Sequence, residues 1–212
     1  MESKKRVSVI GSGSWATAIA KILHESQPSI GWYIRENAII DHLNKYRNNP
    51  SYLSSVQFDL KKVQISNDLN ETIINSDVLV FVVPASFIKT WMEPLKVNFD
   101  NKFIVSAIKG IVPDDDSTIA EYFNRTYNVP FDQIGIISGP SHAEEVALER
   151  LSYLTFSCKN KEHAKEIAEL FDSHYIKTNV GTDIYGTEYS AVLKHIYAIA
   201  AGIAHGLGYG DN

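Results

Sequence analysis

The chain has 212 residues, of which 44% are hydrophobic and 21% are charged. This mixture can bury a core, so it excludes an intrinsically disordered protein, and the length fits one large domain or one domain and part of a second. Lys and Arg number 20 against 25 Asp and Glu, a formal net charge of -5. That charge disfavours a nucleic-acid partner, because nucleic-acid-binding domains present a basic face.

Short β-branched runs alternate with helical patterns in the first half of the chain. Alternating β and α units predict a parallel sheet covered by helices, and the continuous apolar run at 77–83 is typical of a strand buried on both faces. In chain order we predict strands at 7–10, 30–34, 63–65, 77–83 and 103–108, and helices at 14–26, 36–45, 69–75 (capped by Asp68) and 87–95.

After Pro113 the alternation is less regular. We predict helices at 118–125, 141–149 and 162–171, strands at 134–138, 153–157 and 175–178, and a helical character from Asp183 to the end. The fold class is therefore α/β, a doubly wound, mostly parallel sheet of the Rossmann type, followed by the start of an all-helical domain. We place the domain boundary after Thr182, giving domains at 1–182 and 183–212.

The chain lacks the features of an exported or membrane-spanning protein. Its single cysteine, Cys158, forms no intramolecular disulfide and suggests no metal site. The apolar stretch at 7–10 is too short for a signal peptide. The longest uncharged run, 195–210, falls short of the roughly 20 apolar residues of a membrane span. We expect a cytoplasmic protein without a bound metal.

A glycine-rich turn lies between the first predicted strand and helix. Residues 11–16, Gly-Ser-Gly-Ser-Trp-Ala, fit the pattern G-x-G-x-x-G/A in the context that a dinucleotide-binding turn requires. Gly11 permits the tight turn, Gly13 lets a pyrophosphate approach the backbone, and the helix N-terminus attracts its charge. A purely structural glycine turn is the alternative.

The end of the second predicted strand bears on the choice of cofactor. NAD enzymes usually carry an acidic residue there for the ribose diol, whereas this chain has Arg35 followed by Glu36. A guanidinium suits a 2′-phosphate, so the pattern favours NADP over NAD slightly. A solvated Arg35 and a ribose contact from Glu36 are the alternatives, and the preference stays open.

Two further segments carry candidate substrate groups. Lys109 directly follows a buried strand, where ligands of parallel sheets bind, although many lysines at such positions are simple surface charges. Ser141 and Glu144 fit a capping box that starts a helix after the Gly139-Pro140 turn. Free N–H groups at that helix N-terminus would hold a carboxamide or an anionic substrate.

Lys194 is the only residue with a permanent charge at neutral pH in a nearly apolar helical stretch, 191–204. Its helical neighbours Ala198 and Ala201 are small and let other elements approach, so we expect Lys194 to be substantially buried. Burial lowers the pKa of a lysine and suits it to proton transfer near neutral pH. A lysine that extends its ammonium to solvent at a helix edge is the alternative.

Taken together, these segments resemble the bacterial NAD(P)-dependent glycerol-3-phosphate dehydrogenases. Any one of them is weak evidence, but their order and spacing are specific and run through essentially the whole chain. The segments are residues 11–20, 47–49 with 52–53, 82–85, 106–110, 138–147, 193–194, 200–203 and 206–212. One departure is His195, where the family often has Asn, which puts substrate contacts there in doubt.

The resemblance implies a role for individual residues. Ser14, Trp15 and Arg35 would contact the dinucleotide, Lys109 both cofactor and substrate, and Ala143 the cofactor. Gly139 and Ser141 would bind substrate, and Lys194 would be the catalytic acid/base, with Lys109 adding electrostatic stabilisation. Tyr52 is a weaker candidate neighbour of the cofactor.

The implied reaction interconverts dihydroxyacetone phosphate and glycerol 3-phosphate with NAD(P)H, supplying phospholipid synthesis. The partner would be this small molecule, with no nucleic acid and no membrane span, and a homodimer stays open. By the resemblance the chain stops within the substrate domain, so we expect it to bind a dinucleotide better than it turns over substrate. A related 3-hydroxy-acid dehydrogenase and a non-catalytic dinucleotide-binding module are the alternatives.

Overall fold

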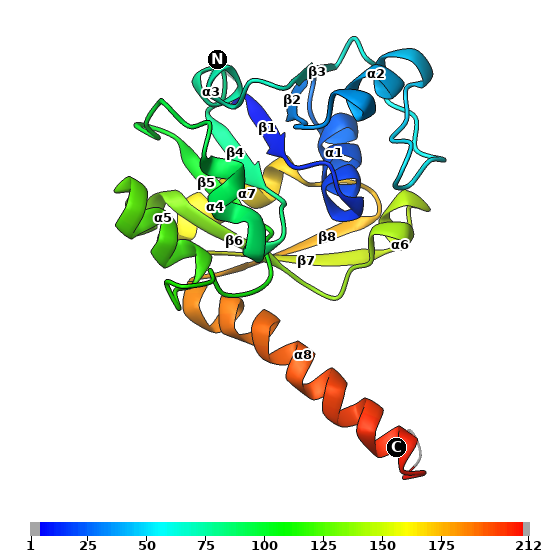
Figure 1. The fold of residues 1–212 in the computed structure, drawn as a ribbon, viewed down its shortest axis with the longest axis vertical. Coiled ribbons are helices and arrows are strands. Elements are labelled where there is room, and N and C mark those ends of the chain that lie inside the picture. Colours follow the sequence, from blue (N-terminus) through cyan, green and yellow to red (C-terminus); the bar gives the residue numbers. More distant parts are fainter. Residues whose placement is uncertain (1–4, 210–212) are drawn as a thin grey trace.

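A computed structural model describes residues 5–209, and one eight-stranded sheet with helices on both faces dominates it (Figure 1). The strands are β1 (Val7–Ile10), β2 (Ile30–Tyr33), β3 (Val63–Ser66), β4 (Val78–Phe81), β5 (Phe103–Ser106), β6 (Ile134–Ser138), β7 (Ser152–Cys158) and β8 (Ile176–Gly181). The helices are α1 (Ser14–Ser26), α2 (Asn37–Tyr46), α3 (Leu69–Ile74), α4 (Ile88–Met92), α5 (Ile119–Tyr127), α6 (Ala143–Ala147), α7 (Lys161–Leu170) and α8 (Ile184–Gly206), with 3-10 turns η1 (Ala85–Phe87) and η2 (Phe131–Gln133).

The sheet order is β3-β2-β1-β4-β5-β6-β7-β8. The first six strands in this order are parallel, β7 runs antiparallel to β6, and β8 runs parallel to β7. The predicted doubly wound, mostly parallel sheet is therefore confirmed. Strand order reverses between β1 and β4, and this switch point is where open α/β sheets bind ligands.

The sheet separates two apolar clusters, one under each layer of helices. Trp32, Phe58, Phe156 and Phe171 belong to one cluster, and Phe81 and Phe123 to the other. Every residue of β4 is buried, which explains why its sequence is apolar without alternation. The core thus holds the carboxyl ends of β1, β4 and β5 in fixed relative positions.

Most predicted elements are confirmed, with shorter ends at the ligand-facing edge of the sheet. β4 ends at Phe81 and β5 at Ser106, so the apolar residues that follow them form loops rather than strand. The helix predicted at 87–95 is η1 followed by α4, which ends at Met92, shortly before Pro94.

The expected capping box at Ser141 and Glu144 is wrong. Helix α6 starts at Ala143 with His142 as its N-cap and no side-chain cap, because the Ser141 hydroxyl donates instead to the carbonyl of Tyr153 on β7, at 2.9 Å. The hydroxyl therefore bonds to a carbonyl on another strand rather than to a backbone N–H of its own helix. The chain does contain a capping box, at Thr118 and Glu121 of α5.

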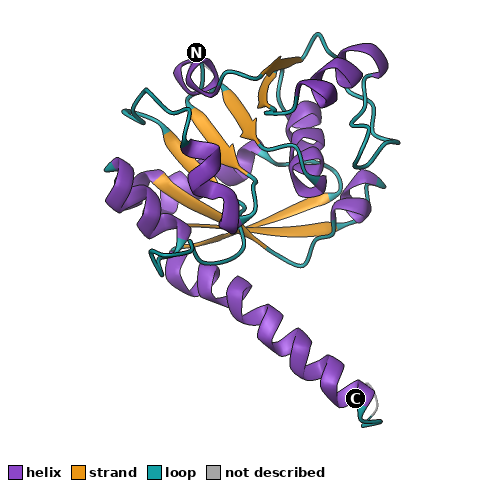
Figure 2. Ribbon diagram, viewed as in Figure 1, coloured by secondary structure: helices purple, strands orange, loops and turns teal. Residues whose placement is uncertain are grey.

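Helix α8 leaves the sheet domain and projects away from it (Figure 2). Only Ile184 and Glu188 of this helix are buried, both near its start. Large apolar side chains further along, such as Leu193, Tyr197 and Ile203, are exposed. Among residues 5–209, no helix is long and apolar enough to cross a membrane.

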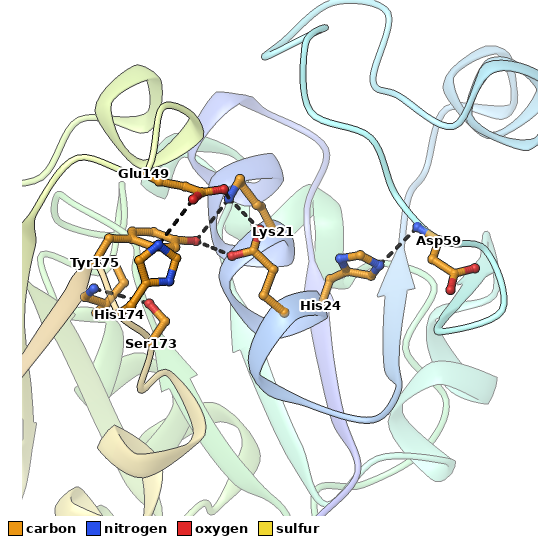
Figure 3. Close-up of polar contacts among 9 residues, drawn as sticks. Lys21, His24, Asp59, Glu149, Ser173, His174 and Tyr175 are labelled. Atoms are coloured by element: carbon orange, nitrogen blue, oxygen red, sulfur yellow. Dashed lines mark hydrogen bonds and ion pairs between the residues drawn. The ribbon is translucent and has the colours of Figure 1, made fainter.

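A buried lysine joins α1 to the loop after α6 and to Tyr175, the residue before β8 (Figure 3). The Lys21 side chain is only 8% exposed, and its Nζ lies 2.5 Å from Glu25 Oε1 and 3.1 Å from Glu149 Oε1. Tyr175 at the start of β8 donates its hydroxyl to Glu25 at 2.6 Å, and His174 lies 3.2 Å from Glu149. These contacts tie α1, which starts at the glycine turn, to the loop after α6.

Candidate active site at the carboxyl edge of the sheet

The glycine turn connects β1 to α1 and uses its two glycines differently. Gly11 has φ +134°, and a Cβ there would lie 2.2 Å from the carbonyl oxygen of Val82, so the fold itself requires glycine. A Cβ on Gly13 would meet no protein atom within 4 Å. The space in front of Gly13 is open, as expected for a backbone that a pyrophosphate approaches.

Two side chains that received no role from the sequence pattern hold this turn. Asn49 is completely buried, and its amide donates to the Ser12 carbonyl at 3.0 Å and to the Thr17 hydroxyl at 2.9 Å. Trp32 on β2 donates its indole N–H to the Gly11 carbonyl at 2.7 Å. The signal for Asn49 was weak, because the sequence around it reads as an ordinary polar loop.

Two adjoining hollows lie at the carboxyl ends of the central strands. The first, about 310 Å³, is lined by Gly13, Ser14, Trp15, Ala16, Val82, Val83, Pro84, Ala107 and Lys109. The second, about 290 Å³, is lined by Lys109, Ser138, Gly139, Pro140, Ser190, Ala191 and Lys194. Lys109 belongs to both, so they form one candidate site with a dinucleotide half and a substrate half.

Another hollow of about 190 Å³ includes residues at the starts of β1 and β2. Its lining includes Arg6, Ser29 and Asn75, which lie at the edge of the sheet away from the glycine turn. Open parallel sheets bind their ligands beyond the carboxyl ends of strands. We therefore do not assign this hollow to the site.

Lys109 follows β5 and extends between the two hollows. Partial burial and the neighbouring charge of Lys194 lower the pKa of Lys109 below its usual value. Two ammonium groups therefore meet over one cleft, which favours an anionic ligand because its charge offsets their repulsion.

Lys194 lies at the predicted site, but the expectation that it is buried is wrong. Its side chain is exposed, as are Ala198 and Ala201 on the same face. Within residues 5–209 no element packs there, because α8 projects away from the sheet.

The turn after β6 supplies the floor of the substrate half. Gly139 has φ +149°, and a Cβ there would lie 2.2 Å from the Tyr153 carbonyl. Ser141 is bonded to that same carbonyl and Ala143 is 8% exposed. Neither Ser141 nor Ala143 lines either of the two hollows, so the structure brings Gly139 into the cleft and leaves these two beside it.

Arg35 and Glu36 stand just beyond β2, outside both hollows. The Arg35 guanidinium lies 5.0 Å from the centre of the Trp91 ring, and its Nε lies 3.8 Å from Glu36 Oε1. Glu36 accepts a hydrogen bond from the Ser12 hydroxyl at 2.8 Å. Sequence reasoning missed Trp91, since nothing in its local pattern distinguishes it from an ordinary core residue.

The strand order, the glycine turn and the hollow at the switch point define a Rossmann-type dinucleotide-binding protein. Comparison with protein families is more specific. The N-terminal domain of NAD-dependent glycerol-3-phosphate dehydrogenase matches residues 6–164, and the C-terminal domain matches residues 183–212. The chain belongs to this family.

Individual relatives agree with this assignment. Glycerol-3-phosphate dehydrogenase [NAD(P)+] of Streptococcus sanguinis is 34% identical over 213 residues, covering 99% of this chain and 62% of the relative. The chain therefore spans less than two thirds of that protein's length. The solved glycerol-3-phosphate dehydrogenase of Coxiella burnetii has a TM-score of 0.85 at 26% identity, with 99% of this chain and 63% of that one covered. The Plasmodium falciparum enzyme gives a TM-score of 0.87 at 25% identity, with coverages of 97% and 60%.

Proposed function

We propose that this protein takes part in the interconversion of dihydroxyacetone phosphate and sn-glycerol 3-phosphate, with NADPH or NADH as the hydride donor. The observation that carries the proposal is that Lys109 lines both the hollow at the glycine turn and the hollow that contains Lys194. A dinucleotide in the first half and a small phosphorylated ketone in the second would meet at this residue. Membership of the family supports the same pairing, and the product would serve phospholipid synthesis.

A dinucleotide held at the glycine turn would supply a hydride to the ketone carbon. The Lys194 ammonium would stabilise the negative charge that grows on the ketone oxygen and give that oxygen a proton. General acid catalysis of this kind contributes about 10²- to 10⁴-fold. Lys109 orients the substrate and adds positive charge beside the same oxygen, and Gly139 and Ser141 shape the substrate half.

For the cofactor, Gly11 and Gly13 form the pyrophosphate turn, and Ser14 and Trp15 contact the dinucleotide from the start of α1. The backbone N–H of Thr17 donates to the Gly13 carbonyl at 2.9 Å, as expected for the first full turn of α1. The backbone N–H groups before Thr17 have no partner within the helix and are free for phosphate oxygens. Arg35 favours NADP slightly over NAD, and Ala143 would lie against the cofactor.

Three further expectations, on domain division, location and oligomeric state, accompany this function. A division into residues 1–182 for the dinucleotide and 183–212 for the substrate is supported by the family match that resumes at residue 183. A cytoplasmic location is supported by the single, buried cysteine. A homodimer is supported by the exposed apolar residues of α8, and sedimentation of the purified chain would test it.

The experiment is to follow NADPH fluorescence with dihydroxyacetone phosphate, comparing the full-length protein with its Lys194→Ala variant. We expect ketone-dependent oxidation of NADPH that falls at least about a hundredfold in the variant, while NADPH affinity is retained. Equal rates in both proteins would remove Lys194 from catalysis. Oxidation with 3-oxo acids but not with dihydroxyacetone phosphate would favour the related dehydrogenase, and binding without turnover of any ketone would favour a binding module.

A further inference from the structure

The guanidinium of Arg35 is held by an aromatic ring as well as by its neighbour on the chain. Its Cζ lies 5.0 Å from the centre of the Trp91 ring, within the range of a cation–π contact. Its pairing with Glu36 is looser, with 3.8 Å between Nε and Oε1. Within residues 5–209 the guanidinium donates no hydrogen bond that would occupy its edge.

Trp91 itself is fixed in the core. It is 7% exposed and belongs to the apolar cluster beneath α4. Tyr33, the last residue of β2, meets it edge to face, with 5.8 Å between ring centres and 82° between planes. The ring is therefore a rigid platform next to the strand end from which Arg35 extends.

Glu36 is drawn in the other direction. Its Oε2 accepts the hydrogen bond of the Ser12 hydroxyl at 2.8 Å, inside the glycine turn. One oxygen of Glu36 is thus engaged at the glycine turn, and the other lies 3.8 Å from Arg35 Nε. Each of the two neighbouring charges has a further partner, Trp91 for the cation and Ser12 for the anion.

We propose that Trp91 determines the preference between NADP and NAD by holding the Arg35 guanidinium for the 2′-phosphate. This inference rests on the proposed role of Arg35. A cation–π contact occupies none of the N–H groups of the guanidinium as hydrogen-bond donors, so they remain free for a phosphate. An arginine already held in place loses less side-chain entropy when the phosphate binds, and that saving increases affinity for the phosphorylated cofactor alone.

The test measures binding of two probes by calorimetry: adenosine 2′,5′-bisphosphate, which carries the 2′-phosphate, and AMP, which does not. In Trp91→Leu we expect affinity for the bisphosphate to fall about three- to tenfold and affinity for AMP to stay within about twofold. Trp91→Phe keeps a ring and should retain most of the bisphosphate affinity. Tyr46→Leu is a matched control, because it removes the contact with Lys45 at 4.9 Å from the ring centre, away from Arg35.

A double-mutant cycle separates a positioning role from a general loss of packing. In an Arg35→Ala background, Trp91→Leu should change the ratio of the two affinities no further. Equal losses for both probes in Trp91→Leu, or no loss for either, would overturn the proposal for Trp91. An unchanged ratio in Arg35→Ala would instead overturn the proposed role of Arg35, so the two failures are distinguishable.

Discussion

Gly11 and Gly13 look equivalent in the sequence motif, yet their surroundings differ. Gly11 is needed by the fold, because its φ of +134° and the Val82 carbonyl leave no room for a side chain. Gly13 has φ -74° and ψ -178°, values that any residue adopts, and open space where its Cβ would stand. Only a ligand would make a side chain at Gly13 unfavourable.

We expect Gly13→Ala to fold like the unmodified protein and to bind the dinucleotide poorly. As Gly13 is the N-cap of α1, the substitution should cost at most about 1 kcal/mol in the free energy of unfolding. NADPH affinity should fall at least about tenfold, because the added methyl displaces the pyrophosphate from the backbone. Thermal unfolding and fluorescence titration measure the two effects.

Gly11→Ala is the matched comparison. We expect it to be strongly destabilised in thermal unfolding and to give a much lower yield of folded protein. Retained NADPH affinity in Gly13→Ala would show that the pyrophosphate does not lie on this turn.

At the scale of elements, a buried carboxylate fixes the start of α8 against α5. Glu188 is 5% exposed, and its Oε1 accepts the backbone N–H of Ala120 at 3.1 Å in the first turn of α5. Its Oε2 is buried with no hydrogen-bond partner among the described residues. Burial raises the pKa of Glu188, against the lowering effect of the polar groups of Thr118, Ala120 and Ile119 at the start of α5.

This raised pKa predicts a pH dependence of stability. The folded protein holds a proton on Glu188 more tightly than the unfolded chain does. Its contribution to stability is therefore complete below the usual pKa of about 4.3 and is lost as pH rises through the higher folded value. Glu188→Gln cannot titrate and keeps an oxygen for the Ala120 N–H, so its unfolding midpoint relative to the unmodified protein should rise across that window.

Thermal unfolding of both proteins at a series of pH values from 4 upward measures this difference. A difference that stays constant, or that shrinks as pH rises, would contradict the raised pKa. Glu188→Ala serves as the control for the lost hydrogen bond and should be destabilised even at the lowest pH.

For the whole molecule, the contacts of Lys21 connect the first helix of the chain to segments about 130 to 150 residues later (Figure 3). The ammonium joins α1 to the loop after α6, where Glu149 adopts a left-handed backbone conformation with φ +56°. Burial and the hydrogen bond to Glu25 raise the pKa of the Tyr175 hydroxyl, so it stays a proton donor. Helix α6 is thereby held against α1.

We expect Lys21→Met to lower the free energy of unfolding by about 1–3 kcal/mol, because it leaves carboxylates and a buried hydroxyl without their charged partner. Urea unfolding measures the loss. Lys89→Met is the matched control: its partner Asp115 is 3.1 Å away and both side chains are at least 40% exposed, so the cost should stay below about 1 kcal/mol. Equal losses would mean that burial adds nothing to the Lys21 contacts.

Sequence reasoning succeeded where the cause is local. The glycine turn, the cap of α3 by Asp68 and the fully apolar β4 depend on residues close together in the chain, and all three occur in the structure. It failed at Ser141, because the Ser141 hydroxyl donates to the Tyr153 carbonyl on β7 instead of capping α6. It also failed at Lys194, which is exposed because burial there depends on what packs over α8. Neither partner is visible from local spacing.

The sequence by itself determined the α/β class, the doubly wound sheet and the positions of Gly13, Lys109 and Lys194 at strand ends or on the last helix, because periodicity and turn chemistry act over a few residues. Only the tertiary structure decided that Lys109 joins the two hollows and that Arg35 rests on Trp91. Those contacts join residues from different elements, and their geometry depends on how the helices pack on the sheet.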